Sequence, residues 1–439
     1  MLTVLRNRIY RHLFAAQVLS LIGTGLATVA LGLLAYELAG AEAGAVLGTA
    51  LAIKMIAYVG VAPVAAAFAE RLPRRAVLVS LDLVRAAIAL MLPFVSEIWQ
   101  VYLLIFVLQS ASAAFTPTFQ ATIPDVLPDE REYTRALSLS RLAYDLESLL
   151  SPILAAALLA VISFHSLFAG TALGFLASAA LVASVALPSP RAGVPRGITE
   201  RTTRGLRIYL ATPRLRGLLA INLAVAAAGA LVIVNTVVFV QAQFGLGARQ
   251  TAFALAAFGG GSMLVALLLP PLLDRWSDRT TMLGGAGILV VGSLLAVFLS
   301  SFAWLLPLWF GIGMGYVLAQ TPSGRLLRRS AHPEDRPALF AAQFALSHAC
   351  WLLTYPLAGW AGAAYGLPIA ALMLALVGAL AAVGALLVWP ARDPETLAHS
   401  HRDLPLHHPH WSHGETAGSE AHAHAFVIDD LHDAWPTRG

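Results

Sequence analysis

The sequence predicts an all-α membrane protein of twelve transmembrane helices in two six-helix halves, and three observations support this fold class. Of the 439 residues, 58% are hydrophobic and only 12% are charged, whereas roughly 25% are charged in soluble domains. The apolar residues form twelve runs, each long enough (~20 residues) to cross a bilayer as a helix. A charged motif after the second run recurs after the eighth, which indicates two parallel repeats.

The first six runs form the predicted N-terminal bundle, residues 1–187. Its expected spans are residues 12–36, 44–69, 76–95, 98–122, 137–162 and 166–187. The first span is too long for the core of a signal peptide, and no small-residue cleavage site follows it, so we expect it to remain as a helix. An arginine-rich polar stretch, residues 188–216, is the expected cytoplasmic central loop.

The second six runs form the predicted C-terminal bundle, residues 217–389. Its expected spans are residues 217–241, 250–273, 280–300, 302–322, 337–363 and 367–389. Residues 390–439 are polar and rich in histidine, and we expect them to form a flexible cytoplasmic tail.

The distribution of arginine predicts the orientation of the spans. With twelve spans, both termini and alternate loops lie on one side of the membrane, and almost all arginines outside the spans fall there. Arg249 alone lies in the loops of the other side. Because short cytoplasmic loops carry the excess of Lys and Arg, we expect both termini in the cytoplasm and the chain in a bacterial inner membrane.

Two residue counts and one missing motif exclude other classes of protein. Lys54 is the single lysine and lies in an apolar run, so there is no Gly-Lys-Ser/Thr phosphate loop for ATP. Cys350 is the single cysteine, which excludes disulfides and thiolate zinc cages. No His-Glu-x-x-His motif of a metal-dependent hydrolase is present. We expect a monomeric membrane protein that is not an enzyme and binds no cofactor and no nucleic acid.

The recurring motif lies in the loops after the second and eighth spans. In each loop an acidic residue precedes an arginine, and a further basic residue follows. The motif residues are Glu70, Arg71, Arg74 and Arg75 in the first half and Asp274, Arg275, Asp278 and Arg279 in the second. Because the two loops occupy equivalent places in the repeat, we expect them to control the gating of the two halves.

The first of these loops resembles the loop motif of the major facilitator superfamily, Gly-x-x-x-Asp-Arg-x-Gly-Arg-Arg/Lys. Ala66, Glu70 and Pro73 stand in place of three of its residues. The resemblance covers about residues 1–390. It implies a central cavity lined by spans 1, 4, 7 and 10, with spans 2, 5, 8 and 11 holding the two halves together.

Other segments are similar to the exporter branch of that superfamily, which includes the enterobactin exporter and macrolide efflux proteins. These segments are Phe115-Thr116-Pro117, Gln120, residues 123–128, Ser151-Pro152, and the pair Asp82 and Arg85. Asp82 and Arg85 lie one helical turn apart, so we expect a structural pair or a gating latch.

Polar residues at helical spacing occur in the four spans that the resemblance places around the cavity. They are Gln17 and Thr24, Gln109 and Thr116, Asn222, and Tyr316 and Gln320. Such side chains either line a cavity or join helices through hydrogen bonds, and the sequence leaves both interpretations open.

Charged residues inside the spans cost ~2.5–3.5 kcal/mol each on insertion, so each requires a partner or a function. Arg141 and Asp145 lie four residues apart and are expected to neutralise one another. Glu147 lies about 200° around the same helix from Asp145 and is the candidate proton-exchanging carboxylate. Its alternative role is a structural ion pair with Lys54.

The span at residues 337–363 contains His348 and Cys350. An intramembrane imidazole close to a soft thiol is a candidate ligand pair for a metal ion in transit. The alternative is that His348 only forms a hydrogen bond within the bundle.

Nine of the 13 histidines in the chain lie in the tail. They are His399, His401, His407, His408, His410, His413, His422, His424 and His432. Their spacing does not match an expression tag, and a proton buffer or pH sensor is an alternative function. Imidazoles interleaved with carboxylates suit Ni²⁺, Co²⁺, Zn²⁺ or Cu²⁺, so we expect the tail to bind a transition metal.

A chain of this superfamily with such a tail resembles the nickel-resistance permeases, which implies Ni²⁺ as the substrate, with Co²⁺ next. The sequence thus predicts a proton-coupled exporter of a divalent transition metal whose partners are the lipid bilayer, the metal ion and protons. Two alternatives stay open: an exporter of a siderophore or amphiphilic drug with a regulatory tail, and a membrane metal receptor.

Overall fold

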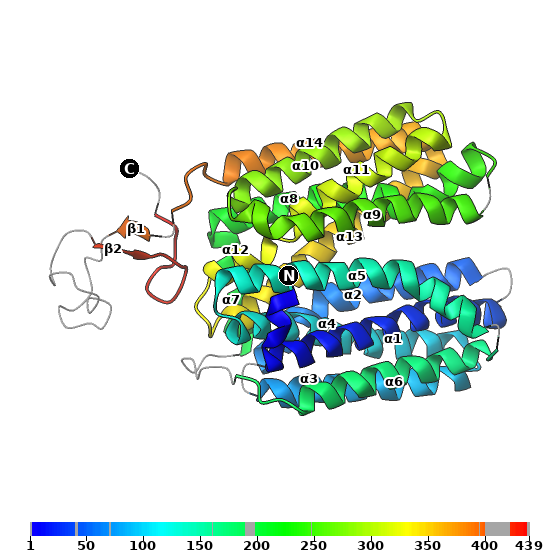
Figure 1. Cartoon of the computed structure of the whole chain (residues 1–439), viewed down its shortest axis with the longest axis horizontal. Helices are drawn as coiled ribbons and strands as arrows, with labels where there is room; N and C mark the ends of the chain where they lie inside the picture. Colours follow the sequence, from blue (N-terminus) through cyan, green and yellow to red (C-terminus); the bar gives the residue numbers. More distant parts are fainter. Residues whose placement is uncertain are drawn as a thin grey trace.

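The computed structural model shows two helical bundles that lie side by side (Figure 1). It describes residues 2–39, 43–69, 72–159, 161–188, 198–246, 248–394, 396–399 and 422–436. The N-terminal bundle begins with a 3₁₀ turn, η1 (Leu2–Arg6), and its helices are α1 (Arg8–Ala39), α2 (Ala43–Ala69), α3 (Arg74–Met91), α4 (Ile98–Val126), α5 (Glu130–Leu159) and α6 (Phe164–Ala183), with η3 (Leu92–Phe94) after α3.

The C-terminal bundle repeats this arrangement. Its long helices are α8 (Pro213–Val237), α9 (Ala248–Leu273), α10 (Asp278–Leu295), α11 (Phe302–Gln320), α13 (Arg336–Tyr365) and α14 (Leu367–Val388). A π-helical turn, η4 (Val238–Gln243), extends α8, and η5 (Ala296–Phe298) follows α10. The all-α fold predicted from the apolar runs is therefore confirmed.

Ten helices in the described part of the chain are long and apolar enough to cross a membrane. The other two long helices are α2 and α5. In α2 the described apolar stretch is shorter, residues 53–65, and α5 carries the charged residues Arg141 and Glu147.

Small residues allow close contact between helices within each bundle. A Cβ atom on Gly174 of α6 would lie 2.7 Å from the carbonyl oxygen of Leu19 in α1. At the same crossing, the Thr171 hydroxyl donates to the carbonyl of Gly23 at 2.9 Å. Close backbone contact of this kind is how membrane helices associate when lipid supplies no hydrophobic driving force between them.

Two helices occur where the sequence predicted loops. The segment expected to be the central loop contains α7 (Ile198–Ala211), and α12 (Ser323–Arg329) follows α11. Gly205 brings α7 against α13, since a Cβ there would lie 2.0 Å from the Ala338 carbonyl oxygen. Both helices lie at the same end of the bundles (Figure 1), which we call the arginine-rich end.

The described part of the tail lies at this arginine-rich end and contains a short sheet. β1 (Thr396–His399) pairs with β2 (His422–Ala425) as an antiparallel two-stranded sheet. Phe426 and Ile428, directly after β2, are buried and belong to the same hydrophobic core as the C-terminal bundle. This short apolar run therefore anchors the end of the chain.

Candidate transport path and gate

Asp125 links the two bundles at the arginine-rich end. Its carboxylate accepts hydrogen bonds from Arg74 of α3 and, at 2.8 Å, from Arg336 of α13. Arg74 is only 3% exposed, so this cluster is largely removed from water. Because Arg74 and Asp125 belong to the N-terminal bundle and Arg336 begins a helix of the C-terminal bundle, the carboxylate holds the halves together.

A second link runs through α12. Arg325 pairs with Glu130 of α5 at 2.7 Å and with Asp278 of α10 at 3.3 Å. Arg328, one turn later, donates a hydrogen bond to the carbonyl oxygen of Pro128. The basic helix α12 thus joins the start of α5 to the C-terminal bundle.

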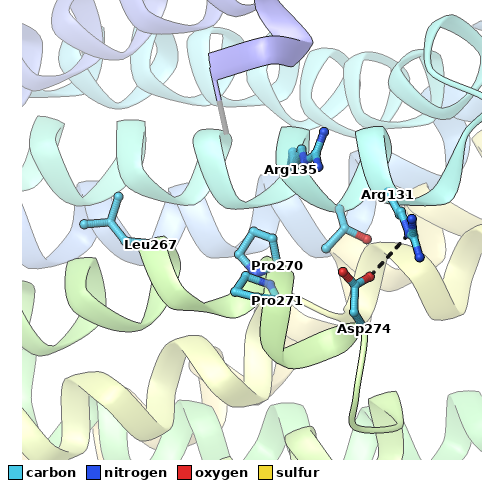
Figure 2. Close-up of a pocket in the computed structure, with 7 residues that line it drawn as sticks. Arg131, Arg135, Leu267, Pro270, Pro271 and Asp274 are labelled. Carbon is cyan, nitrogen blue, oxygen red and sulfur yellow. Dashed lines mark ion pairs between the residues drawn. The ribbon is translucent and has the colours of Figure 1, made fainter.

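A shallow pocket of about 220 Å³ lies between α5 and α9 at this end. Figure 2 shows the side chains of Arg131, from α5, and Asp274, directly after α9, pointing toward one another, and they form an ion pair at 3.7 Å. Both side chains are well exposed, so solvent screens this pair and it contributes little stability. Pro270 and Pro271 form the α9 wall.

The other residues of the two loop motifs have different surroundings. Arg279 donates to the carbonyl oxygens of Trp389 and Leu386 at 3.1 and 3.4 Å, within its own bundle. The rest are Arg75 and Arg275, which are exposed, and Glu70 and Arg71, which lie outside the described residues. The partner residues Asp125, Glu130, Arg325 and Arg336 were not predicted, although Asp125 lies in the segment quoted for the exporter resemblance.

Arg141 of α5 reaches across to the C-terminal bundle. Its guanidinium lies 4.7 Å from the ring centroid of Tyr316 in α11 and 3.5 Å from the Ser262 hydroxyl of α9. The side chain of Asp145, its predicted partner, lies outside the described residues. A cation over an aromatic face is stabilised by the ring quadrupole, most strongly where water is absent.

Glu147 lies at the contact between α5 and α1. A Cβ atom on Gly25 of α1 would be 2.8 Å from its Oε1 atom and 2.0 Å from the Ser151 hydroxyl oxygen. Lys54 of α2 is close enough to act electrostatically on this carboxylate. The structure therefore brings a carboxylate and a hydroxyl together at this contact, with an ammonium group within electrostatic range.

His348 of α13 packs against the N-terminal bundle. Its ring centroid lies 4.7 Å from that of Tyr58 in α2 and 4.1 Å from that of Phe344. Its Nδ1 donates to the Phe344 carbonyl at 2.7 Å, because a carbonyl oxygen can only accept. Cys350 is buried two residues further on, about 200° around the helix. In the described residues, neither belongs to a group of three or more metal-ligating side chains.

Predicted cavity residues that contact another helix include Gln17, Gln109 and Tyr316. The Ser140 hydroxyl of α5 donates to Gln17 at 3.0 Å, and the Tyr58 hydroxyl donates to Gln109 at 2.9 Å. Tyr316 is the aromatic partner of Arg141. The others are Thr24, which bonds to its own helix backbone, Asn222, which is buried, and Thr116 and Gln320, which are half-buried.

Asp82 and Arg85 form a buried pair inside the N-terminal bundle. The Ser178 hydroxyl of α6 also donates to Asp82, at 2.7 Å. The guanidinium of Arg85 lies between the rings of Phe115 and Phe175, 4.1 and 4.5 Å from their centroids. All these contacts lie within one bundle, so the pair stabilises that bundle in this conformation.

Two arginines join the tail to the body. Arg204 of α7 binds Asp335, the N-cap of α13, through two hydrogen bonds of 2.5 and 2.8 Å, and binds Asp430 of the tail at 2.7 Å. Arg214 of α8 is buried, pairs with Asp393 at 3.1 Å, and lies 5.0 Å from the ring centroid of Trp435. Both ends of the described tail are thus tied to the arginine-rich end.

These contacts shift two protonation equilibria outside the membrane. Burial opposes the charge on Asp429, but hydrogen bonds from His332 and His432 outweigh it and hold the pKa of that carboxyl well below its usual range. The same hydrogen bond raises the pKa of His332 above its usual value. The His332 and Asp429 side chains therefore favour opposite charges in the docked tail.

The structure brings three of the predicted tail histidines together. One ring nitrogen from each of His399, His424 and His432 lies within 4.8 Å of the others. The remaining predicted ligands are His401, His407, His408, His410 and His413, which lie outside the described residues, and His422, which lies in β2 with an undescribed side chain.

Comparison with known proteins agrees with this architecture. The family model for the Major Facilitator Superfamily matches residues 13–323 and 217–423. The chain belongs to the major facilitator superfamily. It is therefore a multi-pass membrane transporter and not an enzyme, as the apolar runs and loop motif predicted.

Curated relatives of this facilitator are distant. An uncharacterized transporter of the superfamily, YfiS of Bacillus subtilis, is 24% identical over 343 residues, which cover 73% of this chain and 80% of the relative. Macrolide efflux protein A of Streptococcus pyogenes is 25% identical over 181 residues, or 40% of this chain and 44% of that protein. No nickel-resistance permease is among these relatives.

Solved structures support the fold. The human organic anion transporter MFSD10 superposes with a TM-score of 0.74 at 12% identity, covering 86% of this chain and 99% of that one. The fucose:proton symporter FucP of E. coli gives a TM-score of 0.69 at 14% identity, covering 87% and 98%. At such identities the similarity establishes the shared fold and nothing about substrate.

Proposed function

We propose that this facilitator is a proton-coupled exporter of a divalent transition metal ion, with Ni²⁺ as the leading substrate and Co²⁺ next. We place it in a bacterial inner membrane, with both termini and the arginine-rich end in the cytoplasm. The observation that carries the proposal is the histidine-rich tail, which joins a transporter body at the end where a cytoplasmic ion would enter.

Outward movement of a dication requires an energy source. Against a membrane potential of ~150 mV, inside negative, it costs about 7 kcal/mol before any concentration gradient is counted. The chain has no phosphate loop for ATP, and exchange for two protons would be electroneutral. Protons are therefore the coupling ion that we propose.

Glu147 is the residue that we assign to proton exchange. It is half-buried at the α1–α5 contact, next to Ser151 and within the electrostatic reach of Lys54. An intramembrane carboxylate in a transporter marks a proton or ion pathway by default, because its insertion is costly without a function. Protonation from outside and displacement of the proton by metal from inside would complete the exchange.

The ion pairs at the arginine-rich end determine which side is closed. Asp125 with Arg336, and Glu130 with Arg325, join the two halves there. In alternating access the halves rock against each other around a central site. Entry of a cytoplasmic substrate would therefore require these pairs to separate.

Transport into proteoliposomes tests the proposal. Purified protein is reconstituted with an internal metal-sensitive dye, and uptake of Ni²⁺ or Co²⁺ is measured with and without an imposed pH gradient. Glu147→Gln should abolish gradient-driven uptake, because an amide cannot exchange a proton. Glu37→Gln is the matched control, since Glu37 lies in α1 near the opposite end and its side chain is 51% exposed.

Each outcome has a separate meaning. Normal gradient-driven uptake by Glu147→Gln would remove Glu147 from the mechanism. A parent protein that moves neither metal would remove the metal substrate, whatever the state of Glu147.

A second candidate substrate is an amphiphilic organic compound. The similarity to a macrolide efflux protein favours it, as does the aromatic cluster of Tyr58, Phe344 and His348 between the halves. Aromatic side chains supply a large apolar contact area for an organic ligand. Growth of an expressing, drug-sensitive and metal-sensitive strain on a panel of metals and macrolides distinguishes the two, and Tyr58→Ala should affect only macrolide resistance in the second case.

A further inference from the structure

The tail sheet brings together histidines that are far apart in the sequence. In the antiparallel register, Leu397 lies opposite His424 and His399 lies opposite His422. The turn after β2 then returns His432 to the same place. The ring centroids of His399 and His424 are 4.5 Å apart, and those of His399 and His432 are 4.8 Å apart.

The hydrogen bonds of the three rings determine their tautomers. The Nδ1 atom of His399 lies 3.1 Å from the Leu397 carbonyl oxygen, and that of His424 lies 2.9 Å from the Ala425 carbonyl oxygen. Nδ1 of His432 lies 2.8 Å from Oδ1 of Asp429. Carbonyl and carboxylate oxygens only accept, so each Nδ1 carries the proton. In the neutral ring, Nε2 is then the metal-ligating atom.

The Nε2 atoms of His399 and His432 are 2.9 Å apart. Two unprotonated nitrogens at this distance repel one another unless a proton or a cation lies between them. With metal–nitrogen bonds of ~2.0–2.1 Å, a separation of 2.9 Å corresponds to an angle of about 90° at the metal. Two nitrogens bound to one metal ion through such bonds are at most about 4.1 Å apart. The three histidine nitrogens lie within 4.8 Å of one another, so shifts of less than about 1 Å would allow all three to bind one ion.

The surroundings hold the rings in place. Oδ1 of Asp429 also accepts from the backbone N–H groups of Leu431 and His432, both at 2.8 Å. The buried ring of Phe426 contacts His432 and His399, with centroids 4.6 and 5.0 Å away. A carboxylate behind a ligating imidazole is the usual outer-shell arrangement at protein metal sites.

We propose that His399, His424 and His432 form a site for one divalent transition metal ion, and that the bound ion fixes the tail to the arginine-rich end. Three neutral imidazoles suit Ni²⁺, Co²⁺, Zn²⁺ or Cu²⁺. The site lies outside the membrane-spanning helices and does not rest on the proposed function. It would bind metal whatever the transporter carries.

Docking follows from the position of the site. Asp429, which orients His432, also accepts from His332 in the α12–α13 connection at 3.4 Å. The next residue, Asp430, pairs with Arg204 of α7. An ion that binds only when the tail sheet is formed shifts the equilibrium between undocked and docked tail toward the docked tail by mass action.

Metal binding by the full-length protein in detergent tests the site. Chelator-treated protein is titrated with Co²⁺, whose visible absorption reports nitrogen ligation. The triple variant His399→Gln, His424→Gln and His432→Gln is compared with a matched variant, His12→Gln and His165→Gln, at two histidines outside the tail. We expect the parent and the matched variant to bind one ion tightly, and the site variant to bind at least about 100-fold more weakly.

Tail protection is the second measurement. Co²⁺ should slow proteolysis of the tail in the parent and in the matched variant but not in the site variant. His424→Gln alone, at a half-buried position, provides a variant that keeps the buried His432 intact and should still weaken binding. Equal loss of binding in the site variant and the matched variant, or unchanged binding in the site variant, would overturn the proposal. A shared proton between His399 and His432 would then explain their contact.

The same protein separates this site from the transport assignment. Tight Co²⁺ binding at the tail without metal uptake in proteoliposomes would leave the site standing and reject the metal substrate. Metal uptake that persists in the matched and site variants alike, with Co²⁺ binding unchanged in both, would reject the site alone.

Discussion

The ion pair between Arg336 and Asp125 should control the opening of the arginine-rich end, and Arg336→Gln tests it selectively. The substitution removes the charge that crosses between the halves and leaves the Arg74–Asp125 pair within the N-terminal bundle. The side chains of Arg336 and Asp125 are only 14% and 17% exposed. A hydrogen bond to a charged group contributes about 1.5–3 kcal/mol, so the population open at this end should rise roughly 10- to 100-fold.

Distances between spin labels measure that population directly. Leu72 and Trp276 are both exposed and lie in equivalent loops of the two halves, so Leu72→Cys and Trp276→Cys on a Cys350→Ala background carry the labels. Double electron–electron resonance should show a longer-distance population in Arg336→Gln. Arg216→Gln, which removes an exposed arginine of α8, should leave the distribution unchanged. Identical distributions in Arg336→Gln and the parent would refute the assignment of this pair as a gate.

Three further predictions concern stability and docking. Gly25→Ala places a Cβ within 2.0 Å of a side chain on α5, so thermal unfolding should show a loss of about 1–3 kcal/mol, whereas Gly60→Ala, with open space around it, should show none. Arg85→Gln leaves a fully buried aspartate without its cation and should cost about 3–5 kcal/mol, measured as a lower melting temperature and lower abundance. The raised pKa of His332 means that its bond to Asp429 stabilises docking below pH ~6.5 and that this contribution is lost as pH rises through the raised value. In chelator, parent and His332→Gln should therefore differ in tail proteolysis at low pH and converge at high pH; a constant difference would contradict this.

The membrane helices could be predicted from the sequence because a bilayer requires long apolar runs, and such runs are local. The ends of the helices were less predictable. For example, α4 continues to Val126 through Pro117 and Pro124, four residues beyond the expected span. The segment that forms α7 was predicted to be a loop because it is rich in arginine and has no long apolar run. It is an amphipathic helix, and its apolar face packs on α13 only in the folded protein.

The partners in the gate could not be predicted, since local spacing does not encode which loops of two halves meet. Asp125 and Arg336 are brought together by the packing of α4 against α13. The tail presents the same difficulty. Nothing in the sequence distinguishes one of the nine tail histidines from another as a metal ligand. Only the pairing of β1 with β2 places His399 and His424 close together. The site residues inside the membrane, Glu147 and His348 among them, stay predictions that transport measurements have to test.

The first turn of α13 connects the gate ion pair, Arg336 with Asp125, to the docked tail at the arginine-rich end. Asp335, its N-cap, binds Arg204, which also binds Asp430 of the tail. Arg336, the next residue, binds Asp125 across the halves. Adjacent residues of one rigid helix cannot move independently, so a tail that holds Asp335 in place also favours the position of Arg336 that closes the gate. Coupling of this kind is reciprocal: if metal at the tail stabilises the closed end, opening of the gate must in turn weaken metal binding at the tail by the same factor.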